Sequence, residues 1–114
     1  MDVSKSLPAD FESFYNTFHS DSLFQIDHIN FPLDGATKAK GNNIDMMIPV
    51  KWEKADWIMH KPFNDHNNTF VRKFYMIGPV VVEKISDQNQ FFSMERRFNK
   101  FDNEWFLIYY AVSN

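Results

Sequence analysis

The chain has 114 residues, of which 44% are hydrophobic and 18% aromatic, and its formal net charge at pH 7 is −3. This length predicts a single domain, and the 13 Phe, 3 Trp and 4 Tyr predict a thick, ring-filled core that excludes intrinsic disorder. The lack of a concentrated basic run excludes nucleic-acid binding by phosphate neutralisation, and the lack of cysteine excludes disulfides and thiolate chemistry.

The first expected regular element is a helix that begins at Leu7-Pro8 and ends near His19-Ser20, because proline is favoured in the first turn of a helix. Residues 1–6 are expected to form a flexible polar arm, ahead of one domain over residues 7–114. Four rings spaced for one stripe of the helix follow the proline: Phe11, Phe14, Tyr15 and Phe18. Such a helix should lie flat on a large apolar surface, most simply a sheet.

The middle of the chain is expected to alternate short elements with loops. The order is a short capped turn at residues 20–26, a strand at 29–33, an exposed loop at 34–43, a strand at 44–52, a helical turn at 51–57 and a polar loop at 61–68. Pro32 places the end of the first strand at an edge or in a turn, because proline cannot donate to a strand ladder.

The last part of the chain is expected to be β-structure. Residues 70–77 form a strand that turns at Gly78-Pro79 into a second strand over Val80 to Ile85. The pattern leaves two registers open for the second strand, one residue apart. A long antiparallel hairpin from Phe91 to Val112 then turns at Asp102-Asn103, since these residue types tolerate positive φ.

A two-residue turn sets the expected register of the hairpin. Phe98 should lie opposite Leu107 and Arg96 opposite Tyr109, on the more apolar face, where the helix should pack. A buried guanidinium is costly unless it is paired or reaches water. Arg96 therefore either stacks on Tyr109 or pairs with Glu83, or it lines a water-filled pocket and binds an anionic or carbonyl group.

A helix followed by mostly consecutive antiparallel strands predicts an α+β fold, with the N-terminal helix packed in the concave face of a strongly curved antiparallel sheet. The string from Phe24 to Leu33, with the later Trp52…Asp56-Trp57 element, resembles an uncharacterised bacterial family, domain of unknown function 4348. Members of that family resemble the nuclear transport factor 2-like (cystatin-like) cone. The resemblance covers the chain from about Leu7 and implies this fold.

The same resemblance implies no particular reaction, because one fold hosts many activities. It suggests an exported or lipid-anchored protein, whereas Met1 to Lys5 lacks the apolar segment of a signal peptide. We therefore expect either an extracytoplasmic protein whose leader has been removed, or a cytoplasmic one. No apolar run approaches the roughly 20 residues of a membrane span, so no span is expected.

Enzymes of this cone often use a His or a carboxylate inside the cavity. Asp27 and His28 are neighbours that would point to opposite faces of an extended segment. His19 and Asp21 could meet at the end of the first helix, or, more simply, both are solvated cap residues. The Asp65-His66 pair falls in a polar loop. The four histidines do not have metal-site spacing, so we expect no catalytic residue, no metal and no cofactor.

The remaining candidates are aromatic or basic side chains that could border a cavity. The candidate ligand-binding residues are Tyr15, Trp52, Trp57, Arg96 and Tyr109. In the structural alternative, the tryptophans plug the open end of the cone and Tyr15 is an ordinary core ring. Three functions follow: a non-catalytic domain that binds a small ligand or a protein, a structural module that forms a homodimer, and, with least support, an isomerase- or dehydratase-type enzyme.

Overall fold

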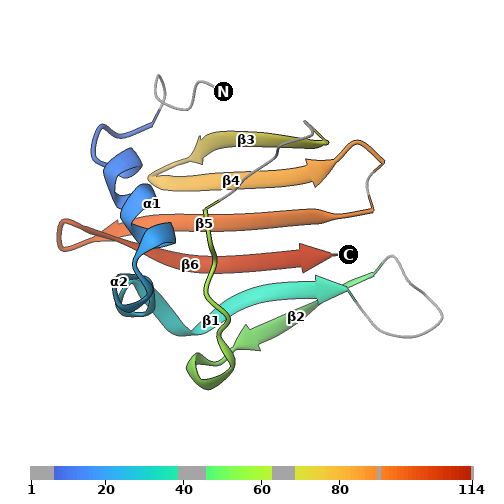
Figure 1. Cartoon of the computed structure of the whole chain (residues 1–114), viewed down its shortest axis with the longest axis horizontal. Coiled ribbons are helices and arrows are strands. Elements are labelled where there is room, and N and C mark those ends of the chain that lie inside the picture. Colours follow the sequence, from blue (N-terminus) through green and yellow to red (C-terminus); the bar gives the residue numbers. More distant parts are fainter. Residues whose placement is uncertain (1–6, 39–45, 63–68, 90, 114) are drawn as a thin grey trace.

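The computed structural model describes residues 7–38, 46–62, 69–89 and 91–113. Within these residues, six strands form one sheet in the order β2-β1-β6-β5-β4-β3, with two helices on one face (Figure 1). The elements are α1 (Phe11–Ser20), α2 (Ser22–Asp27), β1 (Ile29–Lys38), β2 (Met47–Trp52), the 3-10 turn η1 (Lys54–Asp56), β3 (Phe70–Ile77), β4 (Val80–Asp87), β5 (Ser93–Phe101) and β6 (Glu104–Ser113). The expected arm over residues 1–6 and part of each expected loop lie outside the described residues.

The strand pairs are antiparallel except for β1 and β6, which run parallel. The chain reaches β3 from β2 by crossing the whole sheet, from one edge strand to the other. Strands that follow one another in sequence are therefore not neighbours at this point. This crossing is why the sheet is mixed, whereas the sequence favoured an antiparallel one.

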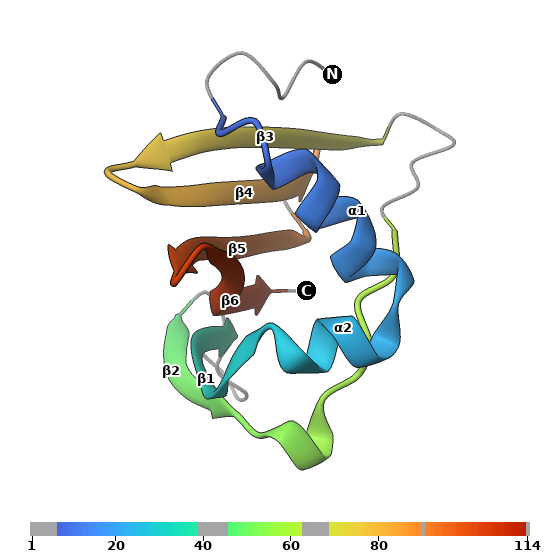
Figure 2. The same cartoon turned by 90° about the vertical axis from the view of Figure 1, so that its left-hand side faces the viewer.

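Helix α1 lies across one face of the sheet (Figure 2). Its aromatic stripe is buried in the core there, as the spacing predicted. The ring of Phe98 on β5 is fully buried, and its centroid lies 5.3 Å from that of Phe11 and 5.7 Å from that of Phe18. Leu107 on β6 is also fully buried in this core. Burying each such side chain stabilises the fold by roughly 1.5–3 kcal/mol, so the helix is held mainly by this face.

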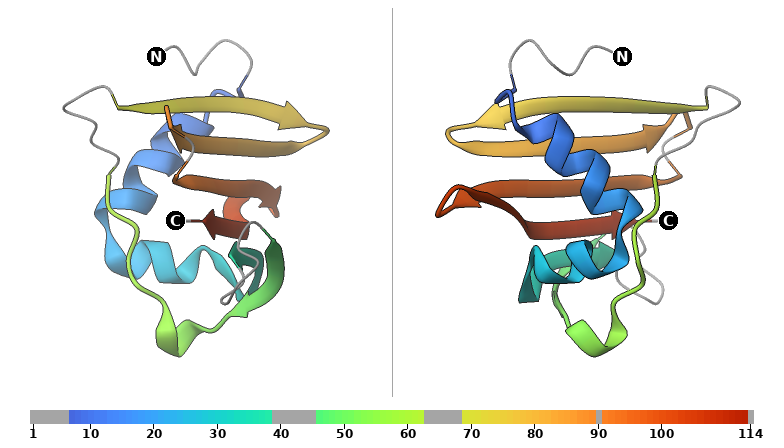
Figure 3. Two further views of the ribbon diagram at one scale, coloured as in Figure 1. Left: turned by 90° about the vertical axis from the view of Figure 1, so that its right-hand side faces the viewer. Right: turned by 60° about the vertical axis from the view of Figure 1, so that its left-hand side comes forward.

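Helix α2 follows directly and lies beside α1 on the same face (Figure 3). The Asp21 carboxylate caps it by accepting from the backbone N–H groups of Leu23 and Phe24, each at 3.1 Å. Strand β1 is longer than expected, because residues 34–37 pair with both β2 and β6, and Lys38 pairs with β2. The exposed loop predicted there is wrong over those residues. Pro32 lies where the pairing of β1 with β6 is interrupted, between Ile29 and Asp34.

The β5–β6 hairpin turns at Asp102 and Asn103, whose φ angles are +50° and +68°, as predicted for this pair. Phe98 lies opposite Leu107, also as predicted. A bulge at Ile108 then shifts the register by one residue, so that Arg96 faces Tyr110 and not Tyr109. Because side chains alternate along a strand, this shift moves Tyr109 to the opposite face of the sheet.

Candidate ligand-binding site

A buried network of charged side chains lies between α1 and the sheet. Glu83 on β4 and Arg96 on β5 are register partners, and their side chains are 1% and 3% exposed. The Arg96 Nε donates to Glu83 Oε1 at 2.8 Å, and Arg72 Nε donates to Oε2 at 3.2 Å. The Tyr15 hydroxyl also donates to Oε2. Of the readings open for Arg96, the pairing with Glu83 is confirmed, and stacking on Tyr109 is wrong.

Two guanidinium groups, those of Arg96 and Arg72, both bond to the carboxylate of Glu83 in this network. Burial raises the pKa of Tyr15, which keeps its hydroxyl protonated as a donor. Burial, and then the charge of Arg96, lower the pKa of His19 to about 4 and that of His60 to about 3. Both imidazoles are therefore neutral at pH 7, and they add no charge to the network.

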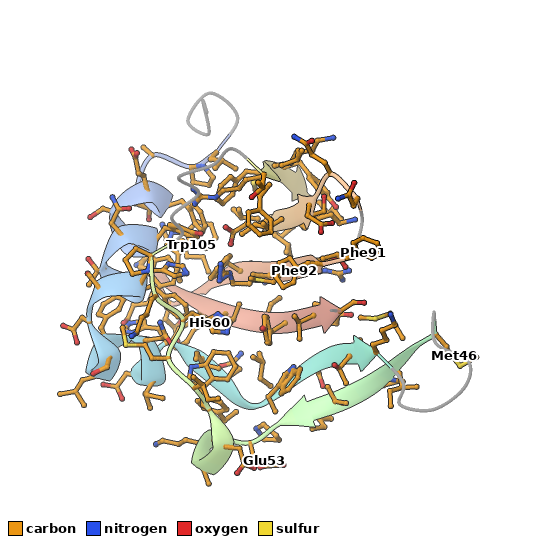
Figure 4. All side chains as sticks on the ribbon, turned by 45° about the vertical axis from the view of Figure 1, so that its right-hand side comes forward. Met46, Glu53, His60, Phe91, Phe92 and Trp105 are labelled. Carbon is orange, nitrogen blue, oxygen red and sulfur yellow. The ribbon has the colours of Figure 1, made fainter. Side chains whose placement is uncertain are left out.

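The strap, residues 57–62, crosses this face of the sheet after η1 (Figure 1). It carries His60 (Figure 4), whose ring contacts the Arg96 guanidinium. Gln25 of α2, whose side chain is fully buried, holds the strap. Its amide nitrogen donates to the carbonyls of Phe18 and His60, and its oxygen accepts from the Trp57 indole and the His60 backbone N–H, all at 2.7–2.9 Å. All four hydrogen-bonding positions of the amide are filled.

Two hollows open on this face and share His60 and Tyr110 as a common wall. The Arg96 hollow, of about 380 Å³, is lined by His60, Lys61, Pro62, Phe70, Ile85, Phe92, Met94, Arg96 and Tyr110. The tryptophan hollow, of about 300 Å³, is lined by Trp52, Asp56, Trp57, Ile58, Met59, His60, Tyr110 and Val112. Both volumes are at the lower end of those typical for small-molecule sites.

The shared wall is built from ring side chains that pack against one another at an angle. The centroid of the Tyr110 ring lies 4.5 Å from that of His60, and His60 lies 4.6 Å from Trp57. The His60 Nδ1 accepts from Arg96 Nη1 at 3.1 Å, as the neutral imidazole allows. His60 therefore joins the buried network to the aromatic cluster, and both hollows border on it.

The structure brings four of the five predicted residues to this face. Arg96 lines one hollow and Trp52 and Trp57 line the other, while Tyr15 lies behind Arg96 through Glu83 and lines neither. The prediction for Tyr109 is wrong. This side chain lies on the opposite face, where the Arg97 guanidinium is 4.3 Å from the centre of its ring. The bulge at Ile108 puts Tyr110 where Tyr109 was expected.

Sequence reasoning missed Gln25, His60 and Tyr110, and it treated Glu83 only as a partner for Arg96. The proposed encounter of His19 and Asp21 does not occur: Asp21 caps α2, and the His19 Nδ1 lies 2.9 Å from the Tyr15 carbonyl. His28 instead contacts Glu104, at 3.1 Å. The Asp65-His66 pair lies outside the described residues. Among the described residues, no three His or carboxylate side chains gather as metal ligands would.

Comparison with solved structures supports the fold. The chain is similar to a nuclear transport factor 2-like protein from Bacteroides fragilis NCTC 9343, with a TM-score of 0.65 and 18% identity, over 98% of this chain and 49% of that one. It is similarly related to a cystatin-like protein from Bacteroides caccae ATCC 43185, with a TM-score of 0.65 and 18% identity, over 89% and 74% of the two chains. The chain thus spans about half the length of the first protein.

No protein-family model and no curated protein matches the chain. The likeness to solved structures shows the fold alone, and the predicted α+β, nuclear transport factor 2-like (cystatin-like) fold is confirmed, with a sheet that is not closed. Across the described part of the chain, no helix has the length and apolar character that a membrane crossing needs.

Proposed function

We propose that the chain is a non-catalytic binding domain that takes a small ligand, through a carboxylate or a similar anionic group, in the Arg96 hollow. The observation that carries the proposal is the buried Arg96 guanidinium in the wall of the hollow, whose Nη1 contacts the neutral imidazole of His60 at 3.1 Å. Arg96 and Lys61 both line the hollow, and its described lining contains no carboxylate. An anion placed there would face the positive charges of these two side chains.

The contact of Arg96 with His60 indicates how a ligand would bind. A neutral imidazole at 3.1 Å is a weaker acceptor than a carboxylate, because charge-assisted hydrogen bonds are shorter and about twice as strong. A ligand carboxylate would therefore displace His60 from Arg96 Nη1 or share the group with it. The apolar side chains of the hollow, such as Met94 and Ile85, would contact the rest of the ligand.

The polar groups near the hollow support binding more than catalysis. Glu83 already accepts from three donors, so it is poorly placed to take a proton from a substrate. A general base works best with a pKa near the working pH, whereas the pKa of His60 is lowered to about 3. An isomerase- or dehydratase-type activity is accordingly the weaker alternative.

The test compares two neighbouring arginines of β5. Acetate and benzoate are titrated into the protein, and the dissociation constant is measured by NMR on the folded state, so that stability and affinity are separated. Arg96→Lys should weaken binding by about tenfold, since a charge-assisted hydrogen bond is lost. Arg97→Lys, on the opposite face, should leave the dissociation constant unchanged. Equal effects of the two substitutions, or no binding to the wild type, would contradict the proposal.

A protein-contact role is favoured by a different surface. The opposite face carries a hollow of about 740 Å³, bordered by Phe91 and Met47, which are 76% and 40% exposed. Exposed apolar side chains beside a hollow often mark protein contacts. A dimer in light scattering that Phe91→Ser dissociates, together with no binding of carboxylates, would favour the dimerisation module.

Membership of family 4348, with the extracytoplasmic location it implies, also remains a proposal.

A further inference from the structure

The tryptophan hollow differs from the Arg96 hollow in the chemistry of its walls. Three rings border it, and they are inclined to one another: the Tyr110 ring makes an angle of 49° with Trp52 and of 76° with Trp57. The corresponding centroids are 5.3 and 5.8 Å apart. At these distances the rings pack against one another, so together they form one aromatic wall of the hollow.

The polar edges of both indoles are already engaged within the protein. Trp52 Nε1 donates to the Tyr110 carbonyl at 2.7 Å, and Trp57 Nε1 donates to Gln25 Oε1 at 2.9 Å. Gly35 makes the first contact possible, because a Cβ at that position would lie 2.3 Å from Trp52 Nε1 and 1.9 Å from the Tyr110 carbonyl oxygen. The rings are therefore fixed, and their π-faces are what they can offer to a ligand.

The charge of this hollow is negative. Asp56, which is exposed at the end of η1, is the one ionised side chain in the described lining, since His60 is neutral and no Lys or Arg borders the space. Neither Arg96 nor Glu83 lines this hollow, and these two side chains pair with each other. Aromatic faces attract cations through their quadrupole, and a carboxylate adds direct attraction.

We propose that the tryptophan hollow is a second binding site, which takes an alkylammonium group against the rings of Trp52, Trp57 and Tyr110 with Asp56 as its counter-charge. The proposal does not depend on an anion in the Arg96 hollow, because the two sites have separate linings apart from His60 and Tyr110. A ligand that carried both charges could reach both sites across this shared wall.

The first experiment compares choline with its uncharged isostere, 3,3-dimethylbutan-1-ol. Each is titrated into the wild-type protein, and the three indole N–H signals are followed by NMR. Choline should shift the signals of Trp52 and Trp57 but not that of Trp105, which lies in the α1 core outside both hollows. The isostere should bind at least about tenfold more weakly, as loss of contacts with two rings implies. Equal affinities would reduce the site to an apolar hollow and overturn the proposal.

The second experiment compares two exposed acidic residues of the same turn. Asp56→Asn should weaken choline binding about threefold to fivefold, as expected for one partly solvated charge pair. Glu53→Gln is the matched control, because Glu53 precedes η1 and does not line the hollow (Figure 4). An equal loss for both variants would indicate general surface attraction and overturn the proposal, as would the absence of choline binding. Acetate binding should be unchanged in both variants, so this test is separate from that of the Arg96 hollow.

Discussion

The Arg96 hollow and the tryptophan hollow lie side by side on the helix-bearing face, but they are supported in different ways. The first rests on ion pairs and a tyrosine hydroxyl contributed by α1 and three strands of the sheet. The second rests on two indole hydrogen bonds, one to a strand carbonyl and one to the amide of Gln25. Buried charged groups therefore support the Arg96 hollow, whereas hydrogen bonds that fix two indole rings support the tryptophan hollow.

Their shared wall is uncharged, and this is what lets the two hollows differ. Burial lowers the pKa of His60 to about 3, and burial also raises the pKa of Tyr110. At neutral pH neither side chain carries a charge. The character of each hollow is therefore set by the side chains that it does not share, chiefly Arg96 in one and Asp56 in the other.

The largest expected effect comes from removing the support of the Arg96 hollow. Glu83→Gln removes the carboxylate that pairs at 2.8 Å with the buried guanidinium of Arg96. Breaking a buried pair in this way costs about 3–5 kcal/mol, which urea unfolding would measure. Glu95→Gln is the control, because Glu95 pairs with Arg97 and Lys84 on the opposite face and should cost about 1 kcal/mol or less. Similar losses of unfolding free energy in both variants would show that the buried Glu83 pair stabilises the fold no more than the Glu95 pairs do.

A smaller effect is expected from disturbing the support of the tryptophan hollow. Gly35→Ala places a methyl group against the Tyr110 carbonyl and the Trp52 indole, both of which must shift. Overpacking of this kind costs about 1–3 kcal/mol. Choline binding should weaken while acetate binding is retained, which would separate the two hollows experimentally. An unchanged free energy of unfolding, measured in urea, would mean that the indole is not held as tightly as the contact implies.

The local parts of this fold could be predicted from the sequence. The spacing of Phe11, Phe14 and Phe18 identified the buried face of α1, and Asp102-Asn103 identified the hairpin turn, because both signals depend on near neighbours. The bulge at Ile108 has no such signal, since neither glycine nor proline marks it. That single inserted residue decided whether Tyr109 or Tyr110 would enter the site.

The site itself depends on contacts between distant parts of the chain. Gln25 and His60 meet because the strap crosses the sheet between its two edge strands. A single glutamine in a short helix and a single histidine in an extended segment give no periodic pattern. Glu83 could be considered as a partner for Arg96, because both lie on strands whose pairing is local, and that part was confirmed.

The shared wall should respond to pH, and His60 links this response to both hollows. The ordinary pKa of histidine is 6.5, whereas the folded values are about 3 for His60 and about 4 for His19. Below pH 6.5 the unfolded chain therefore binds protons that the folded chain does not, so the free energy of unfolding is greatest above pH 6.5 and falls as the pH is lowered toward 4. The slope should approach about 1.4 kcal/mol per pH unit for each histidine.

Urea unfolding at pH 7.0, 6.0 and 5.5 would measure this slope before most carboxylates titrate. In His60→Gln one titrating group is removed, so the slope between pH 6.0 and 5.5 should fall to about half that of the wild type. A wild-type slope near zero would show that the two imidazoles are not held neutral by burial, and the uncharged wall between the hollows would then be wrong.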